Sequence, residues 1–264
     1  MIETAQAFGV DIGGSGIKAA PVDLTKGDFA EPRLKILTPE VSTPQAVAII
    51  VKQQLDHFEV PESAPVGIAF PAPIKPGQKL DFMANLDQSW IGVDVTEVFS
   101  EACGRPVVVV NDADAAGLAE VQFGAAKGQD GLVIATTLGT GIGTALIYNG
   151  VLIPNTELGH IILSAKHLDA EKYASSAIRE NEELGYKKWA KRLTKYYGLM
   201  EKYFNPDLFT VGGGVSRQSE KFLPYVDIKT RSCPPSCVTR PASSVPPTMP
   251  APSSSEPVSV GVQR

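Results

Sequence analysis

Two aspartates and three glycine-rich turns are the features of this chain that could support phosphoryl transfer. Each turn follows an apolar run, and glycine there lets the backbone approach a phosphate and donate its N–H groups. A single such turn is a weak signal because tight hairpins need glycine for steric reasons alone, but three in order favour phosphate binding. The turns are Asp11-Ile-Gly-Gly-Ser-Gly16, Leu138-Gly-Thr-Gly-Ile-Gly143 and Val211-Gly-Gly-Gly-Val-Ser216.

Asp11 ends the first apolar run beside the first of these turns. A carboxylate at this place can hold Mg²⁺, directly or through water, while the ion bridges the phosphates of a donor. Lys18, on the returning run, could aim a positive charge at the same point, although a solvated lysine at a strand edge explains it equally well. The sequence therefore predicts a Mg²⁺ and phosphate site at Asp11 and leaves the role of Lys18 open.

Asn111 and Asp112 stand where a run of valines meets a helical pattern. Proteins of the α/β class place ligands at such carboxyl ends of strands. A carboxylate there could accept the proton of an attacking hydroxyl group, which contributes roughly 10²–10⁴ to the rate. The competing explanation is helix capping, but Asp114 could cap the helix instead. Asp112 is therefore the predicted general base.

Glu157 and His160 lie close together in a segment that follows the second glycine turn and its returning strand. They offer an acceptor and a group that can donate or accept, which suits adjacent hydroxyl groups of a sugar. A lone histidine is more often structural, and His57 and His167 are assigned to that class. His160 is singled out only because of its neighbours.

Apolar periodicity predicts the elements that position these residues. Short unbroken apolar runs, typical of strands covered on both faces, alternate with helical spacing, which indicates an α/β fold. Past Thr230 the composition changes to Pro, Ser, Cys, Thr and Val without periodicity, which indicates a disordered tail. Strands are expected at 7–12, 17–24, 66–70, 107–110, 132–138, 143–148 and 208–211, and helices at 44–58, 95–103, 113–123 and, as one or two helices, within 169–204.

Composition excludes several classes of protein. The chain has 264 residues, 43% of them apolar, and a formal net charge of −5, which argues against a nucleic-acid binder. No apolar run reaches the roughly 18 residues of a membrane span, and the N-terminus lacks the order of a signal peptide, so a cytoplasmic protein is expected. Three cysteines, Cys103, Cys233 and Cys237, are too few for a disulfide framework and complete no zinc site.

Taken together, the motifs resemble the ROK family of sugar kinases and repressors from about residue 7 to 230. The match rests on the order and spacing of Asp11-Ile-Gly-Gly-Ser-Gly-Ile-Lys18, Gly67-Ile-Ala-Phe-Pro71, Asn111-Asp112, Leu138-Gly-Thr-Gly141, Glu157-Leu-Gly-His160 and Gly212-Gly-Gly214. Within the family the chain looks most like the polyphosphate glucokinases and glucomannokinases. That likeness rests on Ala84-Asn-Leu-Asp-Gln-Ser-Trp90, Thr136 to Gly143, Asn155 to His160 and Phe204-Asn-Pro-Asp-Leu-Phe209.

The resemblance implies a two-lobed actin-like, ribonuclease-H-like α/β fold with the active site in the cleft between the lobes. We expect an N-terminal lobe over 1–110 and a C-terminal lobe over 111–230. Asp112 is the implied catalytic base. The implied sugar site comprises Gly67, Asn85, Asn111, Asp112, Glu157 and His160. The implied phosphate and nucleotide site comprises Asp11, Gly13, Gly14, Ser15, Lys18, Gly139, Thr140, Gly141, Gly212, Gly213 and Gly214.

The implied reaction is phosphoryl transfer from polyphosphate or ATP, with Mg²⁺, to the 6-hydroxyl of glucose and also of mannose, by a homodimer. The alternatives are an ATP-only hexose or N-acylhexosamine kinase and a non-catalytic sugar-binding ROK protein. ROK repressors carry a long N-terminal helix-turn-helix, whereas here the first strand begins within ten residues of Met1. A long polyphosphate chain would need a row of lysines leading from the phosphate turns to bind it. The candidates for this lysine track are Lys18, Lys75, Lys79, Lys127, Lys187, Lys188, Lys191 and Lys195.

Two departures from the family pattern stand out. Most ROK proteins carry a cysteine-rich zinc motif after the Glu-x-Gly-His segment, but residues 161–173 contain no cysteine, so no zinc site is expected. The second departure is the segment 231–264, where relatives have a final helix. Deleting one base from GC-rich codons for a family-like sequence would yield Thr230 to Ser244. We therefore hypothesise that 231–264 is a frameshifted tail, arising from a mutation or from a sequencing error.

Overall fold

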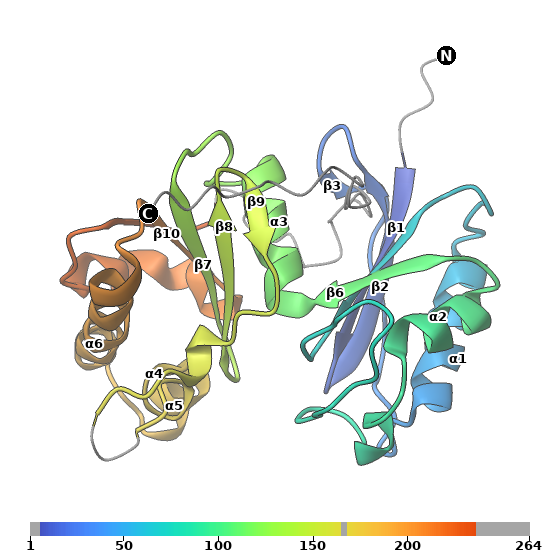
Figure 1. The fold of residues 1–264 in the computed structure, drawn as a ribbon, viewed down its shortest axis with the longest axis horizontal. Helices are drawn as coiled ribbons and strands as arrows, with labels where there is room; N and C mark the ends of the chain where they lie inside the picture. Colours follow the sequence, from blue (N-terminus) through green and yellow to red (C-terminus); the bar gives the residue numbers. More distant parts are fainter. Residues whose placement is uncertain (1–5, 165–167, 236–264) are drawn as a thin grey trace, which may run out of the picture.

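The structure is a computed structural model and describes residues 6–164 and 168–235. It contains two β-sheets, each with its own helices and its own hydrophobic core (Figure 1). Helix α3 (Asp112–Phe123) lies between the sheets in this view. His167 and Cys237 are outside the described residues. Among the described residues, no helix combines the length and hydrophobicity that a membrane span requires.

The first sheet has the strand order β3-β2-β1-β5-β6, with β4 also pairing with β2. Strands β1 and β2 form the predicted antiparallel hairpin, and β1, β5 and β6 run parallel. Their bounds are β1 Gln6–Gly13, β2 Gly16–Asp23, β3 Asp28–Phe29, β4 Leu34–Ile36, β5 Val66–Phe70 and β6 Val107–Asn111, with α1 Pro44–His57, the 3₁₀ helix η1 Gln88–Trp90 and α2 Val95–Cys103.

Local sequence signals explain where the helices of the first sheet begin and end. The Thr43 hydroxyl accepts a hydrogen bond from the N–H of Ala46, and Pro44 starts α1, as predicted. Asp94 caps α2, which ends at Gly104 in the left-handed conformation with φ 65°. Both helices contribute to a core whose largest fully buried members include Trp90 and Phe99.

The second sheet has the order β11-β10-β7-β8-β9. Strands β10 and β7 are parallel, so the glycine turns that follow them lie at the same edge of the sheet. The bounds are β7 Leu132–Leu138, β8 Ile142–Tyr148, β9 Val151–Ile153, β10 Leu208–Gly212 and β11 Arg231–Cys233. The helices are α4 Glu171–Ala174, α5 Ser176–Asn181, α6 Tyr186–Phe204 and the 3₁₀ helices η2 Leu158–His160, η3 Gly214–Lys221 and η4 Leu223–Tyr225.

Two expectations are corrected here. Residues 169–204 form three helices, because Ser175 adopts an extended conformation between α4 and α5 and its hydroxyl caps α5 through the N–H of Ile178. The segment predicted to be disordered past Thr230 begins with strand β11, which pairs in parallel with β10. Backbone hydrogen bonding to a neighbouring strand does not need apolar periodicity, so β11 could not be predicted from the pattern of apolar residues.

Candidate active site

Asn111 and Asp112 lie at the junction of the two sheets, where β6 ends and α3 begins. The Oδ1 atom of Asn111 accepts hydrogen bonds from the N–H groups of Ala113 at 2.9 Å and Asp114 at 3.2 Å. Asn111 is therefore the helix cap, and the expectation that Asp114 caps α3 is wrong. The Oδ1 atom of Asn111 is thereby engaged, and its Nδ2 group donates no hydrogen bond within the described part of the chain.

The environment of Asp112 suits a general base. Helix α3 packs against β7 and β8, so this carboxylate is fixed where the two sheets meet although it remains accessible to solvent. Loss of hydration among the surrounding protein atoms, with smaller contributions from the negative charges of Asp11 and Glu157, raises the pKa of Asp112 to about 6. A base with this pKa is deprotonated at neutral pH yet still attracts a proton.

Asp11 and Lys18 face each other across the first hairpin. They are a directly paired couple in the β1–β2 register, and the Lys18 ammonium donates a hydrogen bond to Asp11 Oδ2 at 3.0 Å. Lys18 is therefore not simply a solvated lysine at a strand edge, because its ammonium is paired with Asp11. Among the described residues no three metal-binding side chains cluster, so a cation here would need donor phosphates as further ligands.

The second glycine turn, Gly139 to Gly141, is anchored by the helices that follow it. The carboxylate of Glu171 accepts the N–H of Ile142 at 3.0 Å, and the N–H of Ala177 donates to the Gly139 carbonyl at 3.0 Å. The N–H groups of Thr140 and Gly141 donate to no acceptor in the described part of the chain. Two N–H groups on an anchored turn are thus available to an anion, and phosphate binding by this turn stays a prediction.

The third glycine turn touches the second at Gly213. Its φ of 86° favours glycine, and a Cβ atom there would lie 2.2 Å from the carbonyl oxygen of Leu138. The two turns line one cavity of about 300 Å³, here called the glycine-turn cavity. Its lining residues are Leu138, Gly139, Thr140, Ser176, Ala177, Arg179, Glu180, Gly214, Val215 and Gln218.

The first glycine turn, Gly13 to Gly16, belongs to the other sheet and does not line that cavity. It instead approaches the loop that carries Asn85, because a Cβ on Gly14 would lie 3.1 Å from the Asn85 carbonyl oxygen. The three turns therefore divide between the sheets, with Gly14 and Ser15 at the exposed tip of the first hairpin.

Glu157 precedes the short helix η2, His160 is its last residue, and both are exposed. The Nδ1 atom of His160 is 3.0 Å from Asp169 Oδ2. Burial lowers the pKa of His160, but the hydrogen bond to Asp169 and the charge of Glu171 outweigh it, so the pKa is raised overall. The orientation of the ring is thus set by Asp169, a residue that sequence reasoning did not single out.

Gly67 is the predicted sugar residue that the fold leaves apart. It lies inside β5, paired with Gly9 on one side and Val108 on the other. Phe70, three residues later, is the one that pairs with Asn111. At about 3.3 Å per residue, Gly67 is roughly 10 Å short of the strand end where Asn111 lies.

Sequence reasoning did not predict the contact between Asp114 and Asn155. Asp114 is 2% exposed, its Oδ2 atom accepts the N–H of Asn155 at 2.7 Å, and its Oδ1 atom has no partner among the described residues. Burial, with the charges of Glu157 and Asp112, raises the pKa of Asp114 to about 6. The only sequence signal was the dipeptide Pro154-Asn155, since asparagine after proline is typical of turns.

Comparison with known proteins decides the family. A model of the ROK family matches residues 7–175. The chain belongs to the ROK family. It is 43% identical to the polyphosphate glucokinase of Mycobacterium tuberculosis (strain CDC 1551 / Oshkosh) over 228 residues, covering 86% of this chain and 84% of that protein. It is 42% identical to the polyphosphate glucokinase of Mycobacterium leprae (strain TN) over 226 residues, covering 85% of this chain and 68% of that one.

Solved ROK structures account for the fold. The inorganic polyphosphate/ATP-glucomannokinase of Arthrobacter sp. strain KM superimposes with a TM-score of 0.82 and 40% identity, covering 91% of this chain and 95% of that chain. The two-lobed actin-like architecture of ROK sugar kinases is therefore that of this protein, as predicted.

Proposed function

We propose that this ROK protein is a glucokinase that transfers a phosphoryl group from inorganic polyphosphate or ATP to the 6-hydroxyl of glucose. The observation that carries the proposal is the position of Asp112, whose pKa is raised to about 6 where the two sheets meet. The likeness to polyphosphate glucokinases at 42–43% identity supports the choice of sugar and donor.

Asp112 would act as the base in this reaction. As the 6-hydroxyl oxygen forms a bond to the terminal phosphorus, the Asp112 carboxylate takes the hydroxyl proton. The bond from that phosphorus to the bridging oxygen breaks, and the bridging oxygen leaves with ADP or with a polyphosphate shortened by one unit. Because Asn111 is fixed as the cap of α3, the next residue has a defined position from which to meet the hydroxyl.

The sugar would lie between Asp112 and the segment around η2. Glu157 directly precedes η2, and its negative charge contributes to the raised pKa of Asp112. Glu157 and His160 would bind neighbouring hydroxyl groups, with His160 held by Asp169. Asn111 and Asn85 would complete the set. Mannose, which differs in an axial 2-hydroxyl, is proposed as a second substrate.

The negative charge around Asp112 would suit a Mg²⁺ ion. Asp11 and Glu157 both act on Asp112 as negative charges, and the Lys18 ammonium donates a hydrogen bond to Asp11. Asp11 would hold the ion, directly or through water, with Lys18 beside it. When bound, Mg²⁺ would neutralise charge on the donor phosphates.

The phosphates would be bound by the glycine turns. Thr140 lines the cavity that Gly214 also lines, and the N–H groups of Thr140 and Gly141 donate to no acceptor among the described residues. Gly13, Gly14 and Ser15 on the first sheet would approach the phosphates from the other side when the lobes close. Closure would also exclude water, so that the sugar hydroxyl and not water is the acceptor.

The deciding experiment measures glucose-6-phosphate formation by the purified protein with Mg²⁺. Polyphosphate and ATP are compared as donors, and glucose, mannose and N-acetylglucosamine as acceptors. Turnover of glucose with both donors is the expected result. Turnover with ATP alone would reject polyphosphate as a donor, and the absence of turnover with either donor would reject the kinase.

Three further properties complete the proposal. The protein is proposed to act in the cytoplasm, in carbohydrate metabolism, as a homodimer of the kind usual in its family. Light scattering coupled to size-exclusion chromatography measures the mass in solution directly. A mass of about 56 kDa, twice the 28.0 kDa of one chain, supports the dimer, and a mass of 28.0 kDa rejects it.

A further inference from the structure

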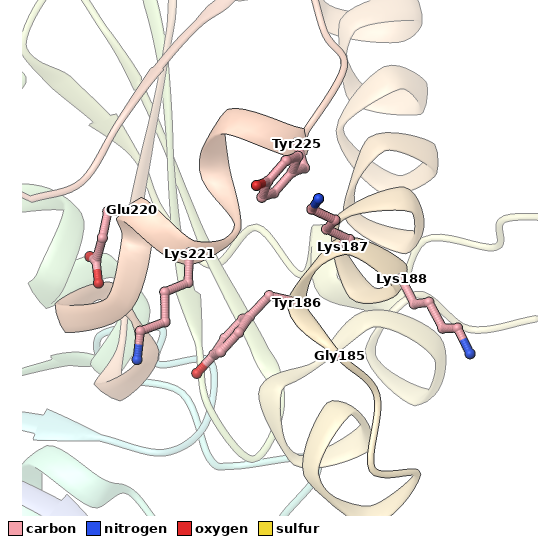
Figure 2. A pocket seen from close by; sticks show the side chains of 7 residues that line it. All are labelled: Gly185, Tyr186, Lys187, Lys188, Glu220, Lys221 and Tyr225. Atoms are coloured by element: carbon pink, nitrogen blue, oxygen red, sulfur yellow. The ribbon is translucent and has the colours of Figure 1, made fainter.

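A groove on the second lobe has no part in the chemistry described so far. It lies between the N-terminus of α6 and the segment that contains η3 and η4, and its volume is about 630 Å³ (Figure 2). We call it the lysine groove. Its lining residues are Gly185, Tyr186, Lys187, Lys188, Glu220, Lys221 and Tyr225.

The lysine groove and the glycine-turn cavity share a wall. Gln218 lines the cavity, and its Oε1 atom accepts hydrogen bonds from the Tyr186 hydroxyl and from the Lys221 ammonium, the latter at 3.2 Å. Arg179 also lines the cavity, and its guanidinium stacks over the Tyr186 ring at 4.7 Å. A polyanion extending from the glycine turns across this wall would therefore reach the lysine groove next.

The groove carries positive charge that the protein does not neutralise. Lys187, Lys188 and Lys221 form no ion pair with any residue of the described ranges. The Lys187 ammonium lies 4.8 Å from the centre of the Tyr225 ring, and Lys221 lies 5.7 Å from that of Tyr186. In Figure 2 Lys187 lies beside the Tyr225 ring and Lys221 lies near Tyr186, whereas Lys188 points away from the other labelled side chains; Glu220 also lines the groove.

One further feature extends this positive surface, whereas the Arg179 guanidinium at the shared wall is already paired with Glu180 at 2.9 Å. Helix α6 begins after Gly185 without a side-chain cap, which leaves its positive end bare. Because the whole chain has a formal charge of −5, such a concentration of cations is a local feature.

We propose that the lysine groove binds the distal phosphoryl units of an inorganic polyphosphate chain whose reacting end lies at the glycine turns. The proposal rests on the polyphosphate-dependent glucokinase activity proposed above and assigns the path of that donor. Lysine, a compact charge on a flexible stem, suits a chain that repeats one negative charge per unit. ATP is the poorer match, because beyond its three phosphates it ends in an uncharged nucleoside.

The test compares two matched double variants. Lys187→Gln/Lys221→Gln removes the charges of the groove. Lys75→Gln/Lys79→Gln removes two other lysines of the predicted track, which line a separate cavity of about 170 Å³ together with Asp81 and Asp94. KM is measured for long-chain polyphosphate, tripolyphosphate, ATP and glucose, and thermal unfolding checks that each variant is folded.

The groove variant should raise KM for long-chain polyphosphate by roughly 5- to 20-fold, the effect of losing two exposed charge contacts. KM for tripolyphosphate, ATP and glucose should stay within about twofold, and Lys187→Arg/Lys221→Arg should restore the long-chain value because it keeps both charges. The KM for long-chain polyphosphate should also become less sensitive to salt, since fewer counterions are displaced.

Three outcomes would overturn the assignment. The first is an unchanged KM for long chains, and the second is an equal rise for ATP and polyphosphate. The third is a larger effect of Lys75→Gln/Lys79→Gln than of the groove variant. If the wild-type protein does not turn over polyphosphate, the proposed donor fails separately, and calorimetric titration with long-chain polyphosphate then tests the groove. In that titration, equal binding by the wild type and the groove variant rejects it.

Discussion

The side chain of Asn155 holds the main chain of Ile74 at two points, and the two residues come from different lobes. The Ile74 N–H donates to Asn155 Oδ1 at 2.8 Å, and Asn155 Nδ2 donates to the Ile74 carbonyl at 2.9 Å. The Asn155 N–H in turn donates to Asp114 on α3. One residue thus links the loop after β5, which leads to Asn85, with the helix that starts at Asp112.

Replacing Asn155 with Ala should loosen this link. Two hydrogen bonds of about 0.5–1.5 kcal/mol each are lost, which predicts a destabilisation of about 1–3 kcal/mol. KM for glucose should rise more than kcat falls, because the loop with Asn85 is no longer positioned against the second lobe. Steady-state kinetics and thermal unfolding measure both effects.

Asn149→Ala is the matched control. Like Asn155, Asn149 has a positive φ, of 48°. Its side chain accepts one hydrogen bond, from the N–H of Gly131 within the second lobe. It should lower the unfolding temperature without changing KM for glucose. Equal KM values for Asn155→Ala and the wild type would show that the link is structural only.

Asp112→Asn should abolish most of the turnover. The substitution keeps the shape of the side chain but removes the proton acceptor, and kcat is expected to fall by roughly 10²–10⁴. Glucose affinity, measured by titration calorimetry without a donor, should change little because hydrogen bonding to the hydroxyl remains possible. A near-normal kcat would remove Asp112 from the mechanism.

The elements with strong periodic or capping signals were predicted correctly from the sequence. Thr43-Pro44 predicted the start of α1, and the valine run predicted β6, because capping and burial act on neighbours in the chain. Long-range contacts could not be predicted. The pairing of Arg231–Cys233 with β10 and the hydrogen bonds of Asn155 to Ile74 depend on how distant segments meet.

The site shows the same division. Asp112 was singled out from its place after β6, with Asp112 and Asp114 weighed as caps of the helix, whereas the cap is Asn111, since an asparagine side chain can cap a helix equally well. Asp169 and Arg179, which act through contacts with His160 and Tyr186, carried no local signal. The role of each predicted site residue, and the lobe boundary at 110/111, stay predictions.

The hypothesis of a frameshifted tail also stays a prediction, because residues 236–264 lie outside the described part of the chain. Resequencing the gene and weighing the intact protein test it. A corrected reading frame would identify a sequencing error, whereas a confirmed gene sequence together with the mass of this chain would leave only a genuine mutation. In the second case, restoring the family-like frame should raise the unfolding temperature.

The pH dependence of the reaction should follow Asp112. Its pKa is raised to about 6, chiefly by loss of hydration, so the carboxylate becomes protonated as the pH falls through 6 and kcat/KM should drop on that side. Above that pH the base is ionised and the rate should level off. The measurement is a profile of kcat/KM from about pH 5 to 8.

Asp114 needs its own control because its pKa is also raised to about 6. Asp114→Asn should keep the acidic limb of the profile if Asp112 causes it. Glu157→Gln should move the limb to lower pH, since the negative charge of Glu157 raises the pKa of Asp112. Loss of the limb in Asp114→Asn would transfer the titration to that residue.

Gly213→Ala should disturb the proposed phosphate site by displacing the backbone that supports the second glycine turn. At φ 86° and ψ 177° the residue is in a region that only glycine adopts readily, so the substitution should cost about 1–3 kcal/mol in strain. Its Cβ would also displace Leu138, which leads directly into Gly139. KM for both ATP and polyphosphate should therefore rise while glucose binding is retained.

Gly214→Ala separates this effect from the loss of any glycine. Gly214 lines the same cavity, but an added Cβ has no heavy atom within 4 Å and its φ is not positive. Its unfolding free energy should change by no more than about 0.5 kcal/mol, and the donor KM should rise less than in Gly213→Ala because the contact with Leu138 is undisturbed. If Gly213→Ala behaves like Gly214→Ala in both measurements, contact between the two turns does not position the donor. The turn that carries the free N–H groups of Thr140 and Gly141 must then be held in place by Glu171 and Ala177 alone.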